Sequence, residues 1–137
     1  MRRLLTTAVV AALALAGAAS ASAPHASIVI RHQVHGCHTW SVDGHAYKAA
    51  QSLKIERGTI VTVKNNDVMP HTLVRVHGPA VSVSHPAMTH MGAVARIVFA
   101  KAGVYRFVTR AGEDYPGMDG MKTVGEDNVL RLTVTVS

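Results

Sequence analysis

Residues 53–71 read LKIERGTIVTVKNNDVMPH, and this stretch decides the fold class. It lies across two short runs rich in apolar and β-branched residues, 52–57 and 59–64, with a turn at Arg57-Gly58 between them. A second turn signal, Asn65-Asn66-Asp67, leads into a third run that begins at His71. The segment therefore predicts consecutive short strands joined by tight turns.

Similar runs cover the rest of the chain beyond its N-terminal apolar segment. The last, residues 129–136, is the clearest, because apolar side chains at 130, 132, 134 and 136 share one face. No helix-length amphipathic segment interrupts these runs. Seven or eight short strands predict an all-β Greek-key sandwich or barrel. The expected strands are 27–35, 52–57, 59–64, 71–77, 80–83, 95–100, 104–109 and 129–136, with 80–83 the weakest.

The first 21 residues have the pattern of an export signal. Arg2 and Arg3 precede an apolar run, and Ala19-Ser20-Ala21 matches a cleavage site. We expect a signal peptide at 1–21, a flexible tail at 22–27 and one domain at 28–137. The exported protein, without a stable membrane anchor after cleavage, would be extracellular, cell-wall-associated or periplasmic.

Charge gives little indication of a nucleic-acid surface. The chain has 14 Lys and Arg against 8 Asp and Glu, a formal net charge of +6 at pH 7. The basic residues are scattered and aromatic residues make up only 4% of the chain, so we expect no nucleic-acid partner.

Metal chemistry is indicated around the single cysteine. Residues 32–40 read HQVHGCHTW, which places three histidines and Cys37 within seven residues. A lone cysteine in an exported protein is a free thiol, an intermolecular bridge or a metal ligand. Thiolate with imidazole suits copper and zinc, so the neighbouring histidines favour a ligand.

Three segments together resemble the cupredoxins, the blue copper protein family. Residues 58–67 match a G-x-x-V-x-V-x-N-x-D strand and turn that leads to a first histidine ligand, here His71. Residues 101–107, KAGVYRF, resemble a later strand of the family, and 129–136 its closing strand. The resemblance covers roughly 28–137 and implies a cupredoxin-like fold with copper as the cofactor.

One loop departs from the family pattern. Cupredoxins draw Cys, His and often Met from the loop after the K-x-G-x-Y-x-F strand, but residues 109–118 read TRAGEDYPGM. Thr109 takes the cysteine position, Glu113 or Asp114 lies near the histidine position, and only Met118 matches. The chain is thus a divergent member by resemblance. Since the first strand of the family ends at the copper pole, Cys37 is expected to supply the missing thiolate there.

The remaining ligands are less sharply defined. His35 and Cys37 share a face of an extended strand, whereas Gly36 permits a bulge that turns His38 inward instead, so both histidines stay candidates. The adjacent Cys37-His38 pair is interpreted as part of a turn, with Trp40 as a packing residue that covers the metal site. The predicted metal ligands are Cys37, His71, His38, His35 and Met118, with His90, Met91 and Met88 as a secondary group that could equally belong to a surface loop.

These observations predict an exported copper-binding protein used in single-electron transfer or in copper handling outside the cytoplasm. A redox protein would be its partner. The alternative is a metal-free cupredoxin-fold module that binds or supports other molecules. Nothing indicates the oxyanion site that a catalytic cysteine would need, or the His-x-His pairs of a copper oxidase, so we expect no enzyme.

Overall fold

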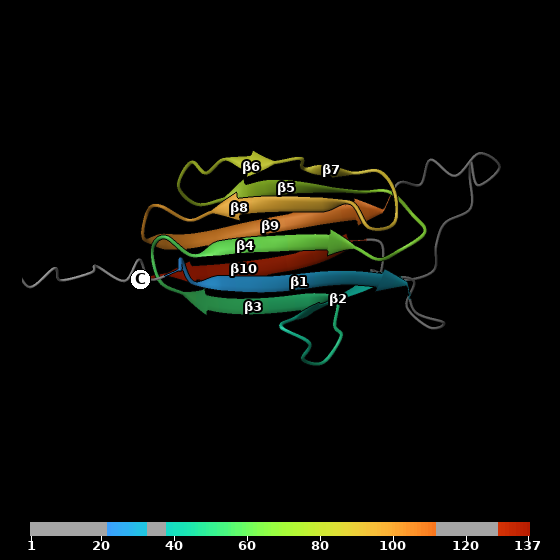
Figure 1. Ribbon diagram of the computed structural model, residues 1–137, viewed down its shortest axis with the longest axis horizontal. Coiled ribbons are helices and arrows are strands. Elements are labelled where there is room, and N and C mark those ends of the chain that lie inside the picture. Colours follow the sequence, from blue (N-terminus) through green and yellow to red (C-terminus); the bar gives the residue numbers. More distant parts are fainter. Residues whose placement is uncertain (1–21, 33–37, 112–128) are drawn as a thin grey trace, which may run out of the picture.

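The computed structural model describes residues 22–32, 38–111 and 129–137. Within these residues the chain forms ten strands in two five-stranded sheets (Figure 1). The strands are β1 (His25–His32), β2 (His38–Val42), β3 (Ala50–Ile55), β4 (Ile60–Asn65), β5 (His71–His77), β6 (Val83–Ser84), β7 (Ala87–Met88), β8 (Val94–Val98), β9 (Gly103–Ala111) and β10 (Val129–Val136).

The two sheets pack face to face as a β-sandwich. One sheet has the order β2-β1-β4-β8-β6 and the other β3-β10-β9-β5-β7. β1 pairs with β4 in parallel and β3 with β10 in parallel, whereas the other neighbours are antiparallel. The predicted all-β sandwich is confirmed. No helix in the described part of the chain is long and apolar enough to cross a membrane.

Alternating side chains of the paired strands build the core between the sheets. Along β10, Leu130, Leu132, Val134 and Val136 are buried, while the residues between them face outward or are only partly covered. Phe99 lies at the centre of an aromatic cluster, with ring centroids 5.0 Å from Tyr105 and 6.1 Å from Phe107. Burial of this apolar surface supplies the main driving force for folding.

The structure corrects several predicted boundaries. β1 begins at His25, so residues 25–27 belong to a strand and not to the expected flexible tail; Ala26 is only 4% exposed. The strand expected at 80–83 is a two-residue pairing at Val83–Ser84, and the short β7 was not expected.

β2 was not predicted either, because residues around His38 were interpreted as a turn. All five of its residues, His38–Val42, are buried. Polar and apolar residues alternate only over Thr39-Trp40-Ser41-Val42, a run too short to predict a strand beside the expected turn. Trp40, at 0% exposure, is a core residue.

Candidate metal centre

Several strand ends meet at one end of the sandwich, on the right in Figure 1. β1 ends there at His32, opposite His38 at the start of β2. β5 starts there at His71, whose partner in the neighbouring strand β9 is Ala111. The connection from β4 to β5 therefore lies at the same end. Residues distant in the sequence are thus gathered at this site pole, the term used below for this end of the sandwich.

Asn65 shapes the connection between β4 and β5. Its side-chain Nδ2 donates to the carbonyl oxygens of Met69, at 2.8 Å, and Met88, at 3.0 Å. Its Oδ1 accepts the backbone N–H of Asp67 at 2.9 Å. The Asp67 Oδ1 in turn accepts the backbone N–H of Met69 at 3.1 Å. These bonds fix the turn and hold the Asp67 carboxylate in the interior, where the residue is 0% exposed.

Two buried histidines converge on that carboxylate. The Oδ2 atom of Asp67 lies 2.5 Å from Nδ1 of His38 and 3.1 Å from Nε2 of His71. The two imidazole rings stand edge to face with centroids 5.1 Å apart. The other nitrogen of His71, Nδ1, is 3.0 Å from the buried hydroxyl of Thr109 on β9.

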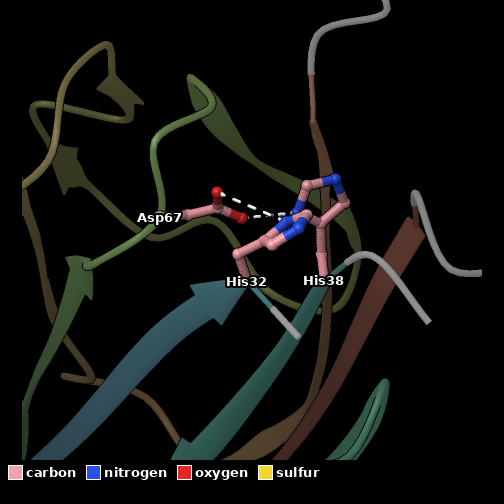
Figure 2. Close-up of side chains that lie close together, drawn as sticks. All are labelled: His32, His38 and Asp67. Carbon is pink, nitrogen blue, oxygen red and sulfur yellow. Dashed lines mark hydrogen bonds and ion pairs between the residues drawn. The ribbon is translucent and has the colours of Figure 1, made fainter. Parts of the chain in front are cut away.

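A third histidine reaches the same carboxylate from the surface. His32 Nδ1 lies 4.0 Å from Asp67 Oδ1, and the His32 side chain is 54% exposed. Figure 2 shows His32 and His38 side by side, both turned toward Asp67. Their ring centroids are 5.7 Å apart. The site pole therefore has one half-exposed and two buried imidazoles around one buried carboxylate.

Electrostatics favour an ionised carboxylate at this position. Burial raises the pKa of Asp67, but the Met69 N–H and the two histidine donors outweigh it and hold the pKa below its ordinary value. Burial lowers the pKa of His71 below 6.5, against the opposing effect of Asp67. Because the carboxylate only accepts, Nε2 of neutral His71 carries the proton, and Nδ1 accepts from the Thr109 hydroxyl.

Two of the predicted ligands come together in the described residues, and three lie outside them. His38 and His71 meet at the site pole, from strands in different sheets. Cys37, His35 and Met118 lie outside the described residues. Thr109, at the position where the resemblance to cupredoxins leads one to expect a cysteine, is hydrogen-bonded to His71 and thus faces the same centre.

The secondary group, Met88, His90 and Met91, is divided between the core and the surface. Met88 is paired with His71 across β7 and β5, and its side chain is fully buried within the hydrophobic core. His90 is exposed and its Nδ1 donates to the carbonyl of Met91, whose own residue is 55% exposed. Among the His, Cys, Asp and Glu side chains of the described residues, His32, His38 and Asp67 form a group whose ligand atoms lie close enough together to hold a metal ion.

Asp67 is a candidate site residue that was not predicted from the sequence. It was present in the Asn-x-Asp signal but was interpreted only as part of a turn. His32 was likewise not among the predicted ligands. The closeness of His32 to Asp67 becomes apparent only from the pairing of β1 with β2 and β4.

Comparisons with known proteins found similar chains among solved structures only. No family model and no curated protein matches the chain. Among solved structures, a purple cupredoxin from Nitrosopumilus maritimus is 24% identical, with 81% of this chain and 98% of that chain covered and a TM-score of 0.48. An amicyanin variant in its oxidized state is 20% identical, covering 81% and 82% with a TM-score of 0.45. A second variant, in the Cu(I) form, is 19% identical over the same shares, with a TM-score of 0.43. The chain resembles cupredoxins, as residues 58–67 and 101–107 also indicate.

Proposed function

We propose that this protein binds copper at the site pole and serves single-electron transfer or copper handling outside the cytoplasm. One observation carries the proposal: two buried imidazoles, on β2 and β5, converge within a ring separation of 5.1 Å. Burying polar rings is costly, and contacts with Asp67 offset that cost here; the pair nevertheless offers two imidazoles, from opposite sheets, to one ion.

The donor chemistry fits copper. Imidazole nitrogen suits copper in both oxidation states, and a buried anion offsets the charge of a bound cation. Asp67 supplies such an anion directly beside His38 and His71. Thr109 supplies a hydroxyl in place of a thiolate, so a thiolate has to come from Cys37, the single cysteine of the chain, which directly precedes His38.

In this proposal Cys37, His71 and His38 or His35 are the strong ligands and Met118 the weak one. A set of three strong ligands and one weak ligand lets copper change oxidation state with little rearrangement, which suits electron transfer. The β-sandwich keeps His38 and His71 in place on opposite sheets, so the ligand geometry is largely fixed before metal arrives. We further propose export through residues 1–21, a redox protein as partner and no enzymatic activity.

A Cu(II) titration of the purified protein, followed by visible absorption, tests this function, with Cys37→Ala as the matched variant. An intense visible band that saturates at one copper per chain, and is missing in the variant, is expected. Colourless copper binding that survives the substitution would move the function from electron transfer to copper handling. No copper binding by either protein would refute the proposal.

A metal-free module is the second candidate, and one observation favours it. Both nitrogens of His71 already have partners, Thr109 and Asp67, so this network is satisfied without an ion. In that case a strong chelator leaves the thermal unfolding temperature unchanged, whereas a copper protein purified with its metal loses stability.

A further inference from the structure

The cluster of His32, His38 and Asp67 offers a coordination chemistry that involves no sulfur. The two histidines come from the end of β1 and the start of β2, and the carboxylate from the connection after β4. Their ligand atoms all lie within 4.8 Å of one another (Figure 2). We propose that these three residues form a site for a divalent cation, Zn(II) or Cu(II), that is independent of Cys37. The inference goes beyond the copper function, because it needs neither a thiolate nor a redox-active metal.

The distances require only a small movement. Nitrogen and oxygen ligands lie roughly 2.0–2.2 Å from Zn(II), so two ligands on a tetrahedral ion are about 3.4 Å apart. Asp67 Oδ2 lies 2.5 Å from His38 Nδ1, while Oδ1 is 4.0 Å from His32 Nδ1. The His38–Asp67 pair therefore has to open by about 0.9 Å and the His32–Asp67 pair to close by about 0.6 Å. The half-exposed ring of His32 can make the second adjustment, whereas the first needs a shift of the buried His38 or Asp67 side chain.

The hydrogen bonds around Asp67 are of the kind that hold metal-binding carboxylates in place. A ligand carboxylate is normally held by hydrogen bonds from residues that do not touch the metal. Here the Met69 backbone N–H binds Oδ1 and His71 Nε2 binds Oδ2. His71 is fixed in turn by Thr109 through its other nitrogen. In this site His71 is therefore a positioning residue for the carboxylate.

The donor set selects divalent ions. Two imidazoles and one carboxylate are borderline and hard donors, which suit Zn(II) and Cu(II), whereas Cu(I) prefers soft sulfur ligands. The single negative charge of Asp67 neutralises half of the charge of a divalent ion in an otherwise buried site. The exposed side of His32 leaves room for water to complete the coordination. The same exposure gives an ion a path to the two buried ligands.

Zn(II) titration by calorimetry tests the site with a redox-silent metal. The Cys37→Ser protein serves as the background, so that a thiolate cannot contribute. We compare His32→Gln and Asp67→Asn in this background with His77→Gln, which removes an exposed histidine from the other end of β5. His32 is exposed, so its replacement tests the site even if the Asp67 variant does not fold.

We expect the background protein and the His77 variant to bind one Zn(II) with equal affinity. The His32 and Asp67 variants should each bind Zn(II) at least about tenfold more weakly, since replacing even a residue that only supports a ligand lowers metal affinity roughly 10–100-fold. Loss of Zn(II) binding in the Cys37→Ser background, or unchanged affinity in the His32 variant, would overturn the inference. A thiolate–copper band in the native protein would still stand in either case, so failure of this site is distinguishable from failure of the copper function.

Discussion

Replacing Asp67 by Asn should be one of the most destabilising isosteric changes in the described part of this chain. The carboxylate accepts three hydrogen bonds, from the Met69 N–H, His38 Nδ1 and His71 Nε2. An asparagine keeps one oxygen, enough for the backbone bond. Its amide nitrogen, however, then faces two ring nitrogens that both carry protons.

The magnitude follows from those two lost bonds. Hydrogen bonds to a charged group contribute about 1.5–3 kcal/mol each, and a change of tautomer at His38 or His71 recovers part of the loss. We therefore expect a decrease of about 3 kcal/mol in the free energy of unfolding without metal. For a domain of this size the unfolding temperature should fall by roughly 10 °C.

Urea unfolding in the presence of a strong chelator measures this effect. The chain has one tryptophan, Trp40, which is fully buried and so reports unfolding by fluorescence. Asp43→Asn is the matched control: this exposed carboxylate accepts one backbone N–H, from Ser27 at 2.7 Å, which asparagine can also accept. The control should change stability by less than about 0.5 kcal/mol. A decrease below about 1 kcal/mol for Asp67→Asn would refute the claim that this carboxylate organises the site.

Three further predictions test the site and the fold. Burial lowers the pKa of His71, so the unfolded chain binds a proton at this residue before the folded chain does. The contribution of neutral His71 to stability is therefore complete above pH 6.5 and declines as the pH falls below that value. With a chelator present, His71→Gln should make the free energy of unfolding depend less on pH between about pH 7 and 5, and an unchanged slope would contradict this. Thr109→Cys, with its Oγ1 position 3.0 Å from a ring nitrogen, should create a thiolate–copper absorption band even in the Cys37→Ala background, and a colourless Cu(II) complex would show that position 109 does not face the metal. Gly78→Ala should lower the free energy of unfolding by about 2 kcal/mol or more, because φ is +103° and a Cβ would lie 2.5 Å from a backbone oxygen of β9. The control Gly44→Ala, at φ +77° with open space around it, should lower it by only about 1 kcal/mol. Equal losses for the two variants in urea unfolding would contradict the steric argument.

The fold was predictable where a strand has one buried and one exposed face. β10 shows this alternation over its whole length, and its observed bounds, Val129–Val136, are the predicted ones. β2 was not predicted, because its alternation covers only four residues, 39–42, and its polar side chains are buried as well, so the strand has no exposed face. A local pattern also carries no information on the two-residue strands β6 and β7, which exist only through their pairing with β8 and β5.

The site shows the same limit more sharply. His71 could be identified from its motif and His38 from its neighbours in the sequence. Asp67 could not, since nothing local distinguishes an inward aspartate from an ordinary turn residue. Its direction depends on Asn65, whose side chain binds the carbonyl of Met88, 23 residues further along the chain. Its partner His38 is 29 residues before it. Only the assembled sandwich brings these groups together.

Thr109 and Asp67 are best understood together. A thiolate at position 109 would place a negative charge beside His71, whereas threonine places a neutral hydroxyl there. Asp67 places a carboxylate at the other nitrogen of the same ring, in a fully buried position. Within the described residues the anion beside these histidines is therefore a hard oxygen, a donor that suits divalent ions better than Cu(I). On this reasoning, Thr109→Cys and Asp67→Asn together should raise the affinity for Cu(I) relative to divalent ions. Competition with a Cu(I) chelator would measure that change, and unaltered Cu(I) affinity in the double variant would contradict the reasoning.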